Sequence, residues 1–211
     1  MSPHVVNAYF GSTLNEIVFP AGILQPPYFD PKADDAVNFG GIGMVIGHEI
    51  MHGFDDRGRR YDADGNLREW WTPADRKRYQ ERAQAVVAQY DAYAGVDGLK
   101  VNGRLTLGEN IADLGGIQIA YLGLQRALAG QPRAKIDGFT PEQRYFLAFA
   151  QAWRSRYRPE RERLQLLTDG HSPPRYRVQG PLANLPEFAQ AFSCPADAKA
   201  LRVEGERVNL W

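Results

Sequence analysis

The stretch VNFGGIGMVIGHEIMHGF, from Val37 to Phe54, decides how the rest of the chain has to be arranged. It is apolar and rich in glycine, which is typical of a buried helix, here expected over about residues 36–54. Glycine lowers the stability of a helix, so the repeated glycines indicate that another part of the chain packs very close. On such a helix His48 and His52 share one face, one turn apart, and Glu49 directly follows the first histidine.

Two imidazoles on one helix face can hold a single metal ion, with Glu49 lying beside it. HExxH on a helix is the pattern of zinc peptidases, in which both histidines bind the metal and the glutamate is the general base. The pattern fixes few residues, so a chance occurrence is the alternative. In that case backbone or carboxylate groups satisfy both histidines, and the protein is a structural one that holds no metal.

A catalytic zinc usually takes three protein ligands and one water, so a further ligand is expected downstream. The stretch LTLGENIADLGG, Leu105 to Gly116, places Glu109 and Asp113 four residues apart at the start of an apolar helix expected from Thr106 to Ala129. Carboxylates are rarely buried unless they are paired or bound to metal. Glu109 can complete the zinc site, and Asp113 can accept the free ring N–H of a ligating histidine. The alternative for Glu109 alone is a solvated helix start, where the helix dipole favours acids.

The stretch TDGHSPPRYRV, Thr168 to Val178, supplies further polar candidates. A zinc-bound water activated by Glu49 would attack a peptide carbonyl and create an oxyanion that needs hydrogen-bond donors. His171 can stabilise that oxyanion, and Arg177 can bind a substrate carbonyl. On the residues alone, a loop histidine and an arginine are more often plain surface groups.

The rest of the chain predicts mostly helices with a small β component, in one domain over residues 1–211. Residues 1–34 contain short β-prone runs broken by glycine and proline. Thr72 and Thr140 each precede a proline, which predicts helix starts, the first helix ending near Tyr93. A short helix is expected from Pro186 to Phe192.

The polar segment after the motif invites readings of its own. Asp62 to Asn66 resembles a calcium loop, but its glycine stands too early and no glutamate follows at the required position, so a plain turn is expected. Asp55 is either a simple turn residue or a hydrogen-bond partner of His52. Arg57, Arg59 and Arg60 are expected to form a solvated or ion-paired face.

Composition excludes several classes of protein. The chain has 211 residues, 44% hydrophobic and 24% charged, and a formal net charge of zero. A neutral chain is not expected to bind nucleic acid or an anionic membrane. No apolar run is long enough to span a bilayer, and the first residues do not read as a signal peptide. The single cysteine, Cys194, allows no internal disulfide.

Several motifs together resemble one known family. NAYF, FPAGILQPP, GHEIMHGFDDRGRRYD, GENIADLGG, RYRPE and DGHSPPRYRV occur in this order over nearly the whole chain. The set resembles the neprilysin family of zinc endopeptidases, the M13 group. The resemblance implies an α+β, mostly α, thermolysin-like catalytic domain of the gluzincin type. It also implies hydrolysis of small peptides on the amino side of hydrophobic residues, with one Zn²⁺ per chain.

The resemblance also implies roles for the residues around the metal. His48, His52 and Glu109 resemble the zinc ligands of the family, and Glu49 resembles its catalytic base. Asp113 resembles the carboxylate that orients a zinc histidine.

Further residues match positions that bind substrate in the family. His171 resembles the group that stabilises the transition state, and Arg177 the arginine that holds a substrate carbonyl. Asn7 and Ala8 resemble the edge-strand pair that hydrogen-bonds the substrate backbone, which is a strand addition. The positions that resemble the apolar S1′ pocket are Ile23, Tyr28, Met44, Val45, Ala152 and Trp153.

The chain departs from the family in length. Family members are much longer and carry an N-terminal portion that closes over the active site, so this chain is expected to be the C-terminal catalytic portion, monomeric, with that portion as a partner. A non-catalytic module that binds peptide or metal is therefore the rival reading. The scarcity of cysteine fits a bacterial member, for which periplasmic, secreted, membrane-anchored and cytoplasmic locations all stay open.

Overall fold

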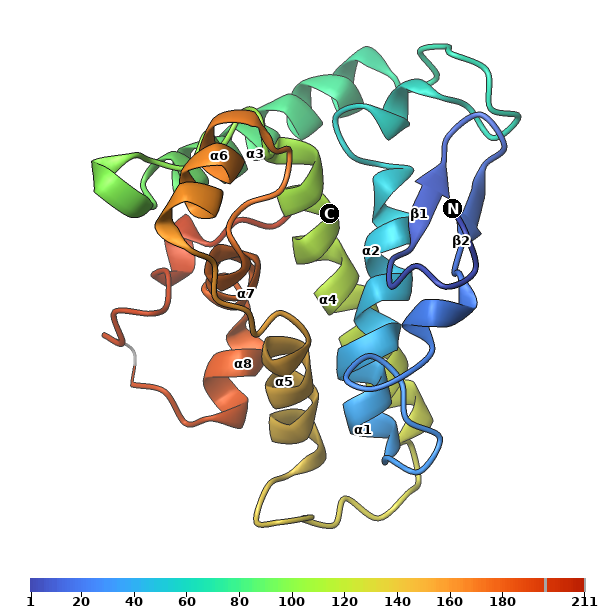
Figure 1. Ribbon diagram of the computed structural model, residues 1–211, viewed down its shortest axis with the longest axis vertical. Helices are drawn as coiled ribbons and strands as arrows, with labels where there is room; N and C mark the ends of the chain where they lie inside the picture. The colour runs from blue at the N-terminus through green and yellow to red at the C-terminus, as the bar shows by residue number, and fades with distance from the viewer. Residues whose placement is uncertain (196, 211) are drawn as a thin grey trace.

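The structure is a computed structural model that describes residues 1–195 and 197–210. Within these residues the chain is mostly helical and has a small antiparallel sheet (Figure 1). The strands and α-helices in chain order are β1 (Tyr9–Gly11), β2 (Glu16–Val18), α1 (Asp35–Asn38), α2 (Met44–His52), α3 (Pro73–Asp91), α4 (Leu107–Ala127), α5 (Pro141–Ala152), α6 (Pro159–Thr168), α7 (Pro174–Leu182) and α8 (Pro186–Ala191).

The glycine-rich stretch forms one helical run through α1, a π-helical segment at Phe39–Gly43 and α2. Asp34 caps its start, because its carboxylate accepts the N–H of Ala36 at 3.0 Å. The helix predicted here is confirmed, although α2 ends at His52, two residues before Phe54. π-helical turns inside α-helices are frequent at functional sites, and this one directly precedes α2, the helix that carries the histidine motif.

Helices α2 and α4 lie side by side through the middle of the molecule (Figure 1). They touch through their backbones at two glycines. A Cβ atom added to Gly47 would lie 2.5 Å from the carbonyl oxygen of Gly116, and one added to Gly116 would lie 2.5 Å from the backbone nitrogen of His48. The close packing expected from the glycines is therefore present, and it brings His48 next to the first turns of α4.

Helix α4 lies between two hydrophobic cores. On one side Ile117 and Leu124 pack in a cluster with the α5 residues Tyr145 and Phe149. On the other side Ile111 belongs to a cluster formed largely by α3. The first part of α4 is buried between these cores, so its polar residues Asn110 and Asp113 are held in the interior.

The helix starts predicted at Thr72 and Thr140 are both confirmed. Thr72 accepts the N–H of Asp75 at 3.1 Å at the start of α3. Thr140 and Gln143 form a reciprocal capping box at the start of α5. Helix α5 ends at Ala152, which places Trp153 at the edge of the cleft described below.

Strands β1 and β2 form a hairpin on the right of Figure 1, with Tyr9 opposite Val18 and Gly11 opposite Glu16. The sheet has no other strand in the described residues, so the second edge of β1 is unpaired. Asn7 and Ala8 directly precede this strand and lie at the cleft. The free edge of β1 therefore begins directly after the two residues for which the resemblance implies strand addition.

Helices α6 and α7 were not predicted. Helix α7 contains Pro174 and Pro181, and proline usually indicates irregular chain. Pro174 occupies the first turn, where its missing N–H would have no partner in any case, and Pro181 is the next-to-last residue, so neither interrupts the short helix. Proline count was therefore a poor guide to this segment.

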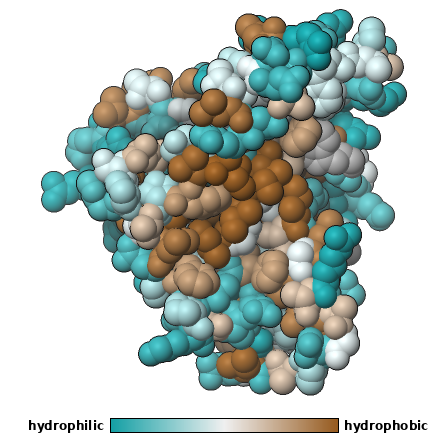
Figure 2. Space-filling view, turned by 90° about the vertical axis from the view of Figure 1, so that its right-hand side faces the viewer, coloured by the Kyte–Doolittle hydropathy of each residue, from teal (hydrophilic) through white to brown (hydrophobic). Residues whose placement is uncertain are grey.

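Apolar side chains gather in a broad patch on one face of the molecule (Figure 2). Large apolar side chains are exposed on α2 at Ile46 and Ile50, and on α4 at Ile119 and Leu122. In soluble proteins such patches commonly mark interaction surfaces. None of the helices in the described residues is both long and apolar enough to cross a membrane.

Candidate active site

A cleft of about 940 Å³ runs between the hairpin, α2, the start of α4 and the segment that leads into α7. It collects nearly all residues that the sequence singled out. The predicted site residues that line it are Asn7, Ala8, Ile23, Tyr28, Val45, His48, Glu49, His52, Glu109, Trp153, His171 and Arg177. Asp113 and Met44 are fully buried behind this lining.

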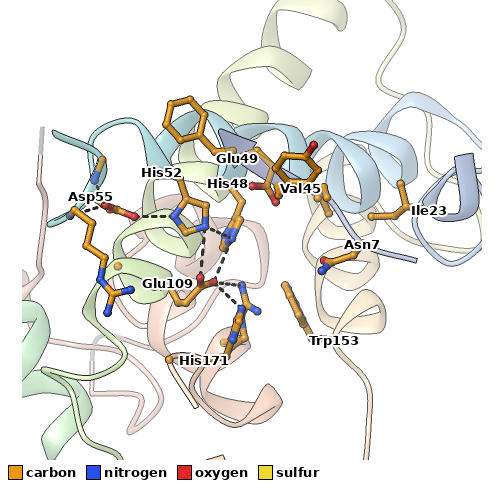
Figure 3. A pocket seen from close by; sticks show the side chains of 18 of the residues that line it. Asn7, Ile23, Val45, His48, Glu49, His52, Asp55, Glu109, Trp153 and His171 are labelled. Atoms are coloured by element: carbon orange, nitrogen blue, oxygen red, sulfur yellow. Dashed lines mark hydrogen bonds and ion pairs between the residues drawn. The ribbon is translucent and has the colours of Figure 1, made fainter. Parts of the chain in front are cut away.

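Three side chains point nitrogen or carboxylate oxygen atoms at one another in the centre of the cleft (Figure 3). The Nε2 atoms of His48 and His52 are 3.0 Å apart. Glu109 places Oε2 3.3 Å from Nε2 of His48 and Oε1 3.5 Å from Nε2 of His52. Zinc binds such ligands at about 2.0–2.2 Å in a tetrahedron, which separates ligand atoms by about 3.3 Å. The three side chains therefore fit a zinc ion closely.

The Nδ1 atoms, which are the outer nitrogens of the two histidine rings, both face carboxylates. Nδ1 of His52 lies 2.7 Å from Oδ2 of Asp55, and Nδ1 of His48 lies 2.8 Å from Oδ1 of Asp113. The second contact is close, although its geometry falls short of a well-aligned hydrogen bond. With hydrogen on each Nδ1, the lone pairs of the two Nε2 atoms face one another, and they repel unless a proton or a metal ion lies between them.

The surroundings favour positive charge at this point. Burial lowers the pKa of His48, but its contacts with Asp113 and Glu109 outweigh burial and raise that pKa to about 9. Burial also opposes ionisation of Glu109, yet the neighbouring His48 and Arg177 hold its pKa below the usual range. Two carboxylates and two imidazoles arranged in this way suit a divalent cation.

The sequence left open whether Asp55 is a turn residue or a hydrogen-bond partner of His52, and in the structure it is both. One carboxylate oxygen faces His52, and the other accepts the backbone N–H groups of Arg57 at 2.8 Å and Gly58 at 2.6 Å. The same side chain therefore shapes the turn after α2 and fixes the orientation of His52.

Glu49 lies in the wall of the cleft beside the three converging side chains. One of its carboxylate oxygens lies within 4.8 Å of a nitrogen of each histidine. Glu109 lies closer to both rings, so Glu109 fits the spacing of a metal ligand better than Glu49 does. Burial raises the pKa of Glu49, while the two histidines act in the opposite direction. A carboxylate with this environment is suited to accept a proton from a nearby water.

Arg177 and Asp113 form a buried, two-pronged ion pair. Nε and Nη2 of Arg177 lie 2.8 Å and 2.7 Å from the two carboxylate oxygens of Asp113. The guanidinium carbon also lies 3.8 Å from the centre of the Trp153 ring. Asp113 is therefore shared between His48 on one side and Arg177 on the other, and it connects the candidate metal centre to the wall formed by Trp153.

His171 faces the same centre from the opposite wall. Its Nε2 lies 3.3 Å from Oε2 of Glu109, and its Nδ1 lies 2.7 Å from Asp169. Asp169 also accepts the backbone N–H of His171 at 2.9 Å. Burial opposes ionisation of Asp169, but both hydrogen bonds from His171 keep its pKa below the usual value. The ring is thus oriented with Nε2 toward the cleft.

The segment that carries His171 is tied to the helices around it. Ser172 donates a hydrogen bond of 2.8 Å to the side chain of Asn110 in α4. Gln165 in α6 donates to the carbonyl oxygens of His171 and Ser172 at 3.2 and 3.3 Å. These bonds fix the position of the His171 segment relative to Glu109.

The apolar end of the cleft is formed by Ile23, Tyr28, Val45 and Trp153, close to Asn7. Met44 does not contribute to its surface, because this residue is fully buried in the core shared with α5. Ala152 is likewise not part of the lining.

The sequence reading missed other residues of the cleft. Asp169 carries the one available signal, an acid two residues before a candidate histidine. Other lining residues that were not connected with the site include Asp56, Arg57, Leu105, Tyr157 and Arg161. They come from segments whose position depends on the tertiary fold.

Exchange of Asp55 for asparagine tests how the carboxylate supports the histidine. Asp55→Asn keeps an oxygen for the backbone N–H groups of the turn but removes the charge beside His52. We expect the dissociation constant for Zn²⁺ to rise by about tenfold, measured by competition with a chromophoric chelator. Asp64→Asn, at an exposed acid of the neighbouring turn, should leave the constant unchanged. Equal affinities in both variants would show that Asp55 serves the turn alone.

Comparison with known sequences gives a consistent result. Peptidase family M13 matches residues 7–208. Endothelin-converting enzyme 1 of Rattus norvegicus is 50% identical over 198 residues, which cover 92% of this chain and 26% of the rat protein. Neprilysin-1 of Caenorhabditis elegans is 49% identical over 201 residues, covering 92% of this chain and 27% of the worm protein.

Solved structures show the same fold. A zinc metalloprotease of Mycobacterium tuberculosis in complex with an inhibitor matches with a TM-score of 0.95 and 49% identity, over 99% of this chain and 33% of that chain. PepO from Lactobacillus rhamnosis matches with a TM-score of 0.89 and 42% identity, over 99% of this chain and 32% of that chain. The chain thus spans about a quarter of the length of these curated relatives and about a third of the solved chains.

Proposed function

The chain belongs to peptidase family M13, and we propose that it is the catalytic domain of a zinc-dependent endopeptidase of the thermolysin-like, gluzincin type. It cleaves peptides on the amino side of hydrophobic residues. The observation that carries the proposal is the convergence of His48, His52 and Glu109 at ligand spacing, with Glu49 beside them. In a longer protein of this family, the remaining polypeptide would be its partner.

His48, His52 and Glu109 would hold one zinc ion. When bound, zinc supplies a Lewis acid that makes a water acidic near neutral pH and polarises the peptide carbonyl. Glu49 accepts the proton from the attacking water and delivers it to the leaving amine. Asp113 and Asp55 act as positioning residues, since each fixes the outer nitrogen of one histidine.

The other residues hold the peptide. Asn7 and Ala8 lie just before the free edge of β1, and an extended peptide can pair there as an added strand. Arg177 has a fork of several N–H donors, so a substrate carbonyl can bind beside its ion pair with Asp113. The hydrophobic side chain after the scissile bond enters the pocket of Ile23, Val45 and Trp153, whereas Met44 supports this pocket from the core.

The proposal is tested by cleavage of a quenched fluorescent peptide that has Phe after the scissile bond. The zinc-loaded chain should cleave it, a chelated sample should not, and mass spectrometry should find the cut before Phe. A sample that contains about one zinc per chain and cleaves no peptide would support the rival reading, a module that binds metal without turnover. A chain that binds no zinc would contradict the proposal.

His171 is expected to act on the negative charge that develops at the carbonyl oxygen. His171→Ala removes the donor that Asp169 orients toward the cleft, and we expect kcat to fall by about 100-fold. The zinc content should stay at the level of the unchanged protein, because His171 is not among the three converging ligands. A fall in kcat that is matched by a loss of zinc would instead make His171 part of the metal site.

A further inference from the structure

The cleft continues beyond the metal-binding centre, away from the apolar pocket. In Figure 3, Asp55 lies on one side of the two histidines, whereas Ile23, Asn7 and Trp153 lie on the other. Arg57 follows Asp55 by two residues, and its backbone N–H is bonded to the Asp55 side chain at 2.8 Å. Arg57 is therefore placed at the end of the cleft opposite the apolar pocket, and it lines that end.

The charge of Arg57 is not held in an ion pair within the described part of the chain, and it acts on the neighbouring Asp56, where it opposes the rise in pKa caused by burial. Arg57 is exposed and makes no ion pair there. Asp55 is occupied by His52 and the backbone of the turn. Asp56 is turned toward α4: its Oδ1 is buried without a hydrogen-bond partner, and a Cβ atom added to Gly108 would lie 3.0 Å from it. Of the solvated or ion-paired face expected from the sequence, Arg57 therefore shows the solvated alternative.

The direction in which a peptide binds determines which of its residues lies next to Arg57. A peptide added antiparallel to β1 runs opposite to the chain direction of that strand. If the residue after the scissile bond occupies the apolar pocket near Asn7, the residues before the bond pass Ala8 and then Phe10. Phe10 and Ser12 line the cleft together with Arg57. At about 3.3 Å per residue, the second or third residue before the bond reaches this region.

We propose that Arg57 is a specificity-determining residue that favours peptides with Asp or Glu at the second or third position before the scissile bond. The inference rests on the proposed peptidase function of the same cleft. A guanidinium binds carboxylates through paired N–H donors. Because this pair is exposed to solvent, the preference is modest: we expect kcat/KM to be up to about fivefold higher for Glu than for Gln.

The test uses quenched peptides that are identical except at the second or third position before the bond, where they carry Glu, Gln or Lys. Each has Phe after the bond, and each is assayed with the zinc-loaded chain, Arg57→Ala, Arg57→Glu and Arg60→Ala. Arg60 is a matched control, since it is an exposed arginine that does not line the cleft. We expect the Glu over Gln preference to disappear in Arg57→Ala, to change to a preference for Lys in Arg57→Glu, and to persist in Arg60→Ala.

The inference is overturned if the ratio of Glu to Gln cleavage is the same in the unchanged chain and in Arg57→Ala at both positions. Failure of the peptidase function is distinguishable, because then the Gln peptide is not cleaved at all. In that case fluorescence anisotropy of the same peptides, labelled and bound to zinc-loaded Glu49→Gln, decides. Tighter binding of the Glu peptide that depends on Arg57 supports the inference, and equal binding overturns it.

Discussion

Glu49→Gln is expected to lower kcat/KM for a Phe-containing peptide by about 1000-fold or more. The amide has nearly the size and shape of the carboxylate, but it cannot take a proton from the attacking water. In the proposed site Glu109, and not Glu49, is the third ligand beside the two histidines, so the variant should still bind about one zinc per chain. Peptide kinetics and metal content are measured on the same samples.

A control separates this effect from a general response to a changed glutamate. Glu204→Gln alters an exposed residue that does not line the cleft, and it should leave kcat/KM unchanged. If Glu49→Gln kept full activity, another group would have to be the base. If it lost its zinc as well as its activity, Glu49 would be acting as a ligand.

Gly47→Ala is expected to lower the free energy of unfolding by about 3 kcal/mol, an effect of overpacking. The added methyl group would lie 2.5 Å from the carbonyl oxygen of Gly116, so the backbones of α2 and α4 have to move apart. That movement also separates His48 from Glu109, and we expect zinc affinity to fall. Urea unfolding of the zinc-free protein and a zinc titration measure the two effects separately.

Gly43→Ala is the matched control in the same helical run. There the nearest atom to an added Cβ is a ring carbon of Phe39 at 3.4 Å, which is an ordinary contact. Alanine is the better helix former by about 1 kcal/mol, so stability should stay equal or rise. If both variants lost the same stability, helix flexibility rather than the contact between α2 and α4 would be the cause.

Local patterns were sufficient for much of the site. Helix geometry alone puts His48 and His52 on one face, and it does the same for Glu109 and Asp113, because residues four apart are neighbours on a helix. The glycines then indicated that another part of the chain packs close to this helix. In the structure that part is α4, which is how both pairs come to one centre. The helix starts at Thr72 and Thr140 were equally readable, since their capping bonds involve only the next few residues.

Contacts between segments far apart in the sequence were harder to predict from it. The ion pair between Asp113 and Arg177 joins positions 64 residues apart, and no periodicity points to it. Whether Arg57 forms an ion pair depends on the directions in which the side chains of Asp55 and Asp56 point. Met44 shows a related difficulty: an apolar residue on a helix beside a cleft can face either the cavity or the core, and here the backbone turns it inward. Such outcomes depend on tertiary packing, which a linear pattern does not contain.

The sharing of Asp113 has a consequence for protein engineering. One buried carboxylate contacts both His48 and Arg177, so the side of the cleft proposed to bind zinc and the side proposed to bind substrate cannot be redesigned separately. A lysine in place of Arg177 would keep the charge but lose the fork that fixes both oxygens of Asp113. Attempts to broaden the proposed substrate range should therefore begin at exposed residues of the cleft and leave His48, Asp113 and Arg177 unchanged.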